Sequence, residues 1–128
     1  MALKSLTVKG CELELSAGEA QEVKITNDPS SKVKCEGKDA YFEKIVFSIK
    51  KYTGTNITNG DGMAEGCIIL GAAQHTFIEG KSAVLEGDTS ANITVVGTQP
   101  SSGGGSQPAQ DIITVKVSSA GQSKVKGS

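Results

Sequence analysis

Hydrophobic and polar residues alternate over several short stretches of the chain. Residues 4–10, KSLTVKG, place Leu6 and Val8 on one face and polar side chains on the other. Such alternation predicts a half-buried β-strand, because successive side chains of a strand point to opposite faces. The same period of two is found in three further segments: 11–16, 21–26 and 111–119.

Two apolar stretches are less regular. Residues 43–52, EKIVFSIKKY, have the local propensity for a short helix, but their Ile, Val and Phe residues favour β-structure, so we predict a strand. Residues 67–73, CIILGAA, are a short continuous apolar run, which predicts a strand covered on both faces. The stretch between them is dense in Gly and Asn, and it predicts a loop or tight turn.

Residues 99–110, QPSSGGGSQPAQ, contain no large apolar residue and predict a flexible loop. Because alternation resumes at residue 111, this loop is expected to join two strands of one domain spanning residues 1–128. The chain has 16 Gly, no Trp and 4% aromatic residues, so its core must be thin. The sequence therefore predicts a small, compact or conical all-β domain of short strands with internal pseudo-repeats.

The charge pattern excludes some classes of partner. The formal net charge is -1, and Lys and Glu are interspersed, so there is no basic stripe to neutralise a phosphate backbone and we expect no nucleic-acid binding. The first ten residues lack a signal peptide, and we expect a protein made in the cytoplasm unless a machine exports it. The three cysteines are widely spaced, which favours reduced, partly buried thiols.

The chain contains an internal repeat. Residues 32–44, KVKCEGKDAYFEK, align without a gap on residues 75–87, HTFIEGKSAVLEG. The repeating unit is a strand, a Glu-Gly-Lys turn in which Gly supplies an unusual φ, and a second strand. A third trace, SKVKG at 123–127, repeats SKVKC at 31–35, and its second arm is expected to be missing because the chain stops.

The stretch from 66 to 90, GCIILGAAQHTFIEGKSAVLEGDTS, resembles PAAR-repeat proteins, the small tips of the central spike in contractile injection machines. The resemblance covers roughly residues 33–98. Two departures make the chain PAAR-like: Ser82-Ala83-Val84-Leu85 stands where the family has Pro-Ala-Ala-Arg, and only His75 is present where the family's metal site uses three histidines and a cysteine. The residues at the family's turn and strand-end positions are Gly37, Lys38, Gly80, Lys81, Gly87 and Asp88.

The resemblance implies a structural role. The protein would cap a trimeric spike protein of a type VI secretion system, phage tail or phage-tail-like particle, and sharpen it for membrane puncture. Effector cargo on its ends or on residues 99–110, and transient contact with the target membrane, would follow from that role, as would residence in a secretion or virion particle. An apolar base is expected, and the candidates for core or docking positions are Ile68, Ile69, Leu70, Val84 and Leu85.

The residues give little support for metal binding or catalysis. Cys67 and His75 are the candidate pair for a Zn or Fe site, but no C-x₂₋₄-C pair accompanies them, and we expect no cofactor. Cys35 aligns with Ile78, as a buried thiol would. With one histidine and no G-x-S-x-G segment, no catalytic residue is proposed and the protein is expected not to be an enzyme.

A different class of function also fits an all-β chain. The protein would then be a self-assembling phage-tail module, or an adhesion or carbohydrate-binding β-sandwich. Such a module would show longer alternating strands and an aromatic platform. Two Tyr and three Phe make that platform hard to build, which favours the spike tip.

Overall fold

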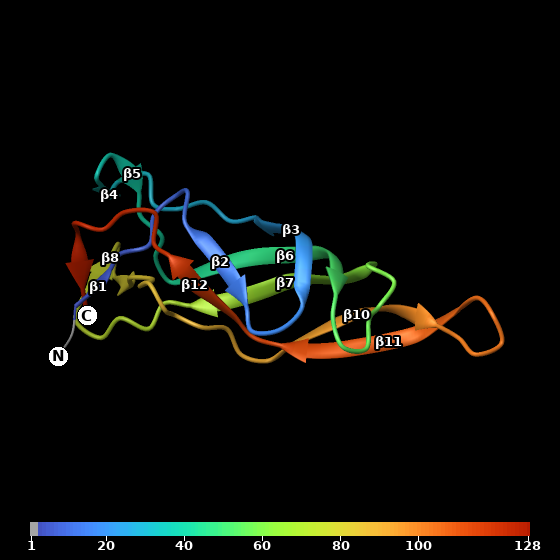
Figure 1. Ribbon diagram of the computed structural model, residues 1–128. Helices are drawn as coiled ribbons and strands as arrows, with labels where there is room; N and C mark the ends of the chain where they lie inside the picture. Colours follow the sequence, from blue (N-terminus) through green and yellow to red (C-terminus); the bar gives the residue numbers. More distant parts are fainter. Residues whose placement is uncertain (1–2) are drawn as a thin grey trace.

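A computed structural model describes residues 3–128 (Figure 1). The described chain is all-β, as the sequence predicts, and it contains no helix of the length and apolarity that a membrane crossing requires. The strands are β1 (Lys4–Ser5), β2 (Glu12–Leu15), β3 (Glu19–Ile25), β4 (Lys34–Cys35), β5 (Lys38–Asp39), β6 (Lys44–Thr53), β7 (Gly62–Leu70), β8 (Phe77–Ile78), β9 (Lys81–Ser82), β10 (Ile93–Pro100), β11 (Ser106–Ile113), β12 (Val115–Ser119) and β13 (Lys126–Gly127).

The long strands form one antiparallel sheet in the order β11-β10-β7-β6-β3. A separate antiparallel pair, β2 with β12, packs beside this sheet. The alternating positions of both face a common interior, where Tyr52 and Phe47 are the largest fully buried side chains. The larger core of the molecule consists of Tyr41, Ile45, Phe47, Ile49, Tyr52, Ile57, Cys67, Ile69, Val84, Val95, Ala109, Ile113, Val115 and Val117.

Two sequence expectations are wrong in this part of the molecule. Residues 99–110 are mostly strand, because β10 continues to Pro100 and β11 begins at Ser106, which leaves a short turn in place of a flexible loop. The Gly, Ser, Pro and Gln residues of this stretch do not prevent strand formation. β11 is an edge strand, and an edge strand tolerates a proline such as Pro108. The strand within 67–73 is covered on one face only, because Ile68 and Leu70 are exposed.

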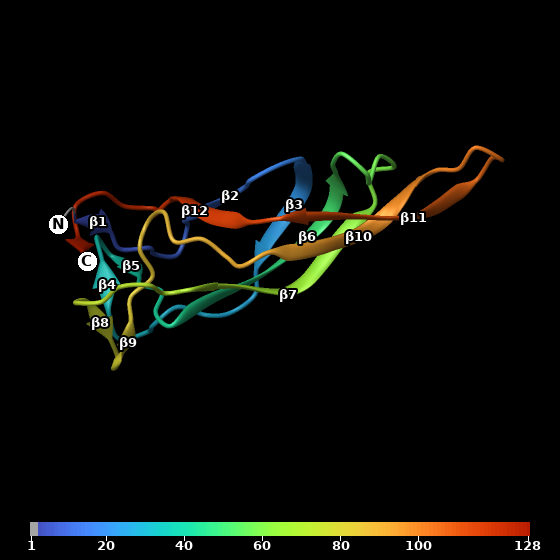
Figure 2. The same cartoon turned by 90° about the horizontal axis from the view of Figure 1, so that it is seen from below.

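Three small antiparallel pairs gather at the end of the molecule opposite the turn between β10 and β11 (Figures 1 and 2). These are β4 with β5, β8 with β9, and β1 with β13. The last pair brings both ends of the described chain together. A smaller hydrophobic core lies inside this end and consists of Leu6, Val8, Cys35, Ala40, Ala73, Ile78, Ala83 and Leu85.

Candidate functional site

The three small strand pairs belong to three equivalent units. The first unit spans residues 32–43 and the second spans 75–86, as the sequence repeat predicts. The third unit is split: residues 124–128 supply its first arm and residues 3–9 supply its second. The expectation that the third unit lacks a second arm is therefore wrong. We call these three units together the threefold end.

The split unit has a sequence signal that the alignment missed. Residues 4–10 read KSLTVKG and residues 81–87 read KSAVLEG, so Lys, Ser and Gly recur at the same spacing. Gly10 and Gly87 both adopt positive φ, at 97° and 93°. An alignment that allows the repeat to begin in its second arm would have found this match.

The two continuous units turn in the same way. Glu36 and Gly37 have φ of 53° and 78°, and Glu79 and Gly80 have φ of 51° and 79°. Two consecutive positive φ values in a two-residue loop are the geometry of a type I′ hairpin turn, which matches the right-handed twist of the flanking strands. Glycine at the second position takes this conformation without steric cost.

A closed ring of backbone hydrogen bonds joins the units. The Tyr41 N–H donates to the Thr7 carbonyl at 2.9 Å, the Thr7 N–H to the Val84 carbonyl at 2.8 Å, and the Val84 N–H to the Tyr41 carbonyl at 3.3 Å. Each unit thus donates to one neighbour and accepts from the other. This cyclic order is what a threefold axis generates, although here all three units come from one chain.

Two further sets of hydrogen bonds are related by the same threefold rotation. Within each unit, an N–H of the second arm donates to a carbonyl of the first arm at 3.0 Å; between units, an N–H donates to the neighbouring second arm at 2.8–2.9 Å. The first set joins Leu6 to Val125, Ala40 to Val33 and Ala83 to Thr76. The second set joins Lys9 to Asp39, Glu43 to Ser82 and Glu86 to Ser5. The nine backbone hydrogen bonds are therefore of three kinds, and each kind occurs three times, once for each unit.

The side chains between these bonds divide between the two cores. Thr7, Tyr41 and Val84 hold equivalent positions and are 0–5% exposed; Tyr41 and Val84 belong to the larger core. The residues on either side of them point into the smaller core. Each second arm therefore has one face on each core, so the threefold end is anchored to the rest of the molecule.

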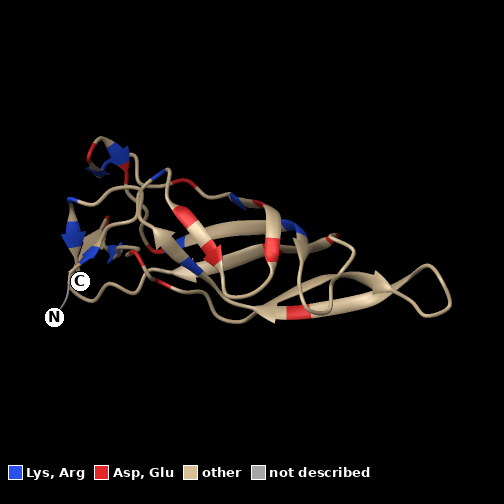
Figure 3. Cartoon of the chain, in the orientation of Figure 1, with Lys and Arg blue, Asp and Glu red and all other residues tan. Residues whose placement is uncertain are grey.

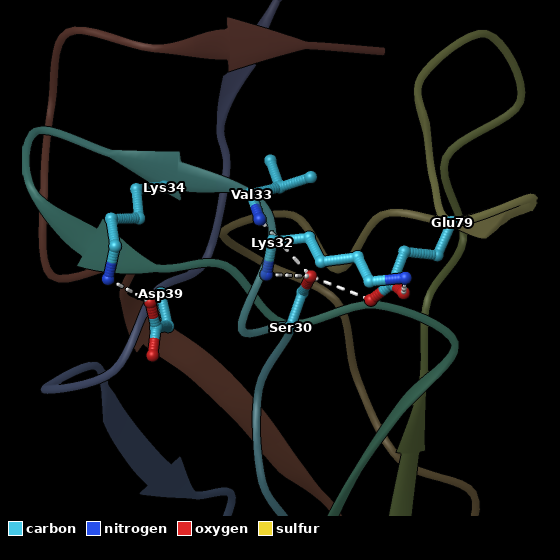
Figure 4. Close-up of polar contacts among 6 residues, drawn as sticks. All are labelled: Ser30, Lys32, Val33, Lys34, Asp39 and Glu79. Carbon is cyan, nitrogen blue, oxygen red and sulfur yellow. Dashed lines mark hydrogen bonds and ion pairs between the residues drawn. The ribbon is translucent and has the colours of Figure 1, made fainter.

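Charged side chains also link neighbouring units (Figure 4). Lys32 lies 3.9 Å from Glu79, and its equivalent Lys124 lies 3.8 Å from Glu36. The Ser30 hydroxyl donates to Glu79 at 2.7 Å. At the third junction, the N–H of His75 donates to the Ser128 carbonyl at 2.8 Å. Exposed ion pairs contribute about 0–1 kcal/mol each, so the backbone bonds and the small core carry most of the stability of this end.

The threefold end is the basic part of the molecule (Figure 3). It carries eight of the thirteen lysines and five carboxylates, whereas the rest of the chain carries five lysines and nine carboxylates. Lys4, Lys38 and Lys81 occupy equivalent positions and are all exposed. Phe77 is 59% exposed and Leu3 is 60% exposed on the same end. A ring of lysines with apolar side chains beside it can bind an acidic partner surface that is also partly apolar.

The residues singled out from the sequence occupy several places. Gly37 and Gly80 lie in the two hairpin turns, and Lys38 and Lys81 begin the strands that follow them. Asp88 is 9% exposed. Its carboxylate accepts the N–H groups of Leu85 at 2.9 Å and Ala72 at 3.1 Å, so Asp88 stabilises the turn at residues 85–88 and links it to the segment after β7.

The candidates for core or docking positions fall into two groups. Ile69 and Val84 are fully buried and Leu85 is 5% exposed, while Ile68 and Leu70 are exposed on β7.

The candidate metal pair lies in two different surroundings. Cys67 is buried in the larger core, and His75 is exposed next to the last described residue. Within residues 3–128, no three His, Cys, Asp or Glu side chains gather where they could hold a metal ion. Burial raises the pKa of the Cys67 thiol, and burial together with the charge of Glu36 raises the pKa of Cys35. At both positions burial thus disfavours the thiolate, which is the form that binds a metal ion.

Comparison of the chain with protein-family models, with curated proteins and with solved structures gave no match.

Proposed function

We propose that this protein is a structural tip that docks by its threefold end on a trimeric spike protein of a contractile injection machine. The observation that supports this proposal is the three sets of backbone hydrogen bonds, each of which repeats once in every unit. A single chain with a pseudo-threefold axis presents three similar contact surfaces, so it matches a trimer without leaving two subunits uncovered. If three copies of this chain covered the spike together, each copy could match one subunit, and no repetition within the chain would be needed.

The charges define the partner's surface. Lys4 and Lys81 make no ion pair with another described residue, so they are free to bind carboxylates. The partner is therefore a trimer whose end carries an acidic residue from each subunit around an apolar centre. Complementary charges of this kind set orientation and association rate more than affinity.

The turn between β10 and β11 lies at the end of the molecule remote from the docking end (Figure 1). In the proposed assembly this narrow hairpin points away from the spike, toward the target membrane. Cargo joined at residues 101–105 would be carried in front of the spike, whereas cargo joined at the chain ends would lie beside the docking surface.

Stoichiometry tests the proposal. The chain is mixed with a purified trimeric spike protein of a contractile injection machine, and the mass is measured by light scattering after size exclusion. One chain of 13.1 kDa should bind per trimer. Three chains per trimer would contradict a pseudo-threefold match. Rings or fibres formed by the chain alone would support the self-assembling tail or adhesion module instead.

A matched pair of charge variants locates the surface. Lys4→Glu combined with Lys81→Glu should weaken binding to the trimer at least tenfold, because each change places a like charge against the acidic ring. Lys50→Glu combined with Lys51→Glu changes the net charge equally on β6, outside the threefold end, and should leave binding unchanged. Equal weakening by both pairs would show that only the net charge matters, and the threefold end would not be the docking surface.

A further inference from the structure

Strands β7 and β10 are neighbours in the five-stranded sheet, yet within the described chain they pair at one position, Met63 with Val96. From there they separate toward the threefold end (Figures 1 and 2). The cause is a bulge in β7: Glu65 and Gly66 stand opposite the single residue Ser48 of β6, and Gly66 has a φ of 67°. A bulge bends its strand and increases its twist, which turns β7 away from β10.

The separation leaves an open groove of about 590 Å³ between the two strands. Cys67, Ile93 and Ala64 are buried or half-buried in its floor, and Ile68 is 41% and Val96 46% exposed at its sides. Its one charged residue is Glu65, and the full lining is Met63, Ala64, Glu65, Gly66, Cys67, Ile68, Ala91, Asn92, Ile93, Thr94 and Val96.

The β7 side of the groove is an open strand edge. The N–H of Gly71 donates to the carbonyl of Glu43 at 2.8 Å, which places an N–H just after β7 in the ladder with β6. Backbone groups of an antiparallel strand point to alternate sides. Those of Ile69 therefore face β6, and those of Ile68, which lines the groove, face the β10 side, where no strand is paired with them.

The β10 side is open in the same way. Pro108 of β11 stands opposite Thr98 and has no N–H to donate, and the Thr98 carbonyl accepts the Asn59 N–H at 3.3 Å, so Thr98 directs its backbone groups away from β11. Its N–H indeed donates to the Asp61 carboxylate at 2.9 Å. Two alternations further along β10, Thr94 has the same orientation, and its N–H and carbonyl point into the groove.

We propose that this groove binds an extended segment of a partner polypeptide, which enters the sheet as an added strand between β7 and β10. The two facing strand edges present backbone donors and acceptors, at Ile68 on β7 and at Thr94 on β10, and an extended backbone can pair with both. Because β7 and β10 are antiparallel, the added strand runs parallel to one of them and antiparallel to the other. This site is separate from the threefold end and does not depend on the docking function proposed above.

The lining specifies the sequence of the added strand. Small or β-branched apolar side chains fit the floor on alternate positions. A lysine directed toward Glu65 is favoured, whereas an acidic segment is disfavoured by that same charge.

A synthetic peptide tests the groove. The probe is the fluorescein-labelled hexapeptide amide Thr-Val-Thr-Val-Lys-Val, added to the full chain and followed by fluorescence anisotropy. Its control is the same peptide with every second backbone nitrogen methylated, which keeps the side chains and removes hydrogen-bond donors. We expect saturable binding of the first peptide and at least tenfold weaker binding of the second. Equal binding of both, or no saturable binding, would overturn the proposal.

Two proline variants test whether the peptide binds in the groove. Thr94→Pro removes an N–H that faces the groove, and Ile112→Pro removes an N–H on the outer edge of β11, directly opposite Thr94 in the same strand pair. Neither change breaks the ladder between β10 and β11. Thr94→Pro should weaken binding of the peptide at least tenfold, and Ile112→Pro should leave the binding unchanged. If the chain without peptide dimerises and Thr94→Pro abolishes the dimer, a second copy occupies the groove and the proposal is wrong.

Discussion

Lys4 lies opposite Gly127 in an antiparallel strand pair, so the two ends of the described chain complete one unit of the pseudo-threefold arrangement. The Ser5 carbonyl accepts the Glu86 N–H at 2.9 Å. The carbonyls of Asp39 and Ser82 accept the equivalent hydrogen bonds in the other two units. The ring of units is closed in space although the chain is open.

This pairing predicts that the chain can be circularly permuted. A Glu-Gly turn between Gly127 and Lys4, replacing Ser128 and residues 1–3, copies the turns at 36–37 and 79–80, and new ends are opened between Gly103 and Gly104. We expect a folded protein with a melting temperature within several degrees of the original, because exposed turns tolerate new ends and the joined arms are already paired. Circular dichroism and thermal melting would measure this.

A second permutant provides the control. It has the same Glu-Gly join but is opened between Ser48 and Ile49, inside β6, where the backbone pairs with strands on both sides. It should fail to fold. An unfolded protein in both cases would contradict the pairing of β1 with β13.

The two hairpin turns should be sensitive to a single methyl group. Gly37 and Gly80 have φ near 79°, and a Cβ at either position would meet no atom within 4 Å, so Gly→Ala costs backbone strain alone. We expect each substitution to lower the free energy of unfolding by roughly 1–2 kcal/mol. Chemical denaturation measures the change. Gly103→Ala, also in open space but without a positive φ, is the matched control and should change stability little. Equal effects at all three positions would refute the turn geometry.

The sequence predicted several of the strands and both repeated turns, because these are encoded locally, but it predicted a loop at residues 99–110, where β10 and β11 continue. Alternation identified β2 and β3, and the Glu-Gly-Lys string identified the two hairpins. It did not predict the split unit, because the pairing of Lys4 with Gly127 joins residues at opposite ends of the chain.

It also missed the bulge at Glu65 and Gly66, which depends on the register between β6 and β7 and decides where the sheet opens. Both depend on contacts between segments distant in sequence. No local pattern of residues reports the bulge, whereas the split unit left a signal in the recurrence of Lys, Ser and Gly at 4–10 and 81–87.

Among the buried side-chain polar atoms of residues 3–128, one has no hydrogen-bond partner, and it lies in the split unit. Thr7 is fully buried, and its hydroxyl oxygen has no hydrogen-bond partner, whereas the equivalent position in the second unit is Val84. An unsatisfied buried hydroxyl costs about 1–3 kcal/mol. Thr7→Val keeps the side-chain shape and should therefore raise the free energy of unfolding by about 1–2 kcal/mol. Thr53→Val, at an exposed position of β6, should change it little. A destabilised Thr7→Val variant would mean that the hydroxyl has a role that the structure does not account for.

Alkaline pH should destabilise the protein through Cys11. Burial raises the pKa of this thiol from its ordinary 9.0 to about 11, with a smaller opposing effect from a backbone hydrogen bond. The folded state thus retains a proton that the unfolded state loses first. The stabilisation from the buried neutral thiol is complete below about pH 8, and it is lost as the pH rises from 9 toward 11.

Thermal melts at pH 8, 9 and 10, under reducing conditions, measure this loss. The melting temperature of the original protein should fall more steeply with pH than that of Cys11→Ala, which lacks the ionising group. Other groups that titrate in this range, including Tyr41, whose burial raises its pKa to about 12, are present in both proteins and cancel in the comparison. Parallel pH profiles for the two proteins would show that Cys11 ionises as readily in the folded state as in the unfolded state.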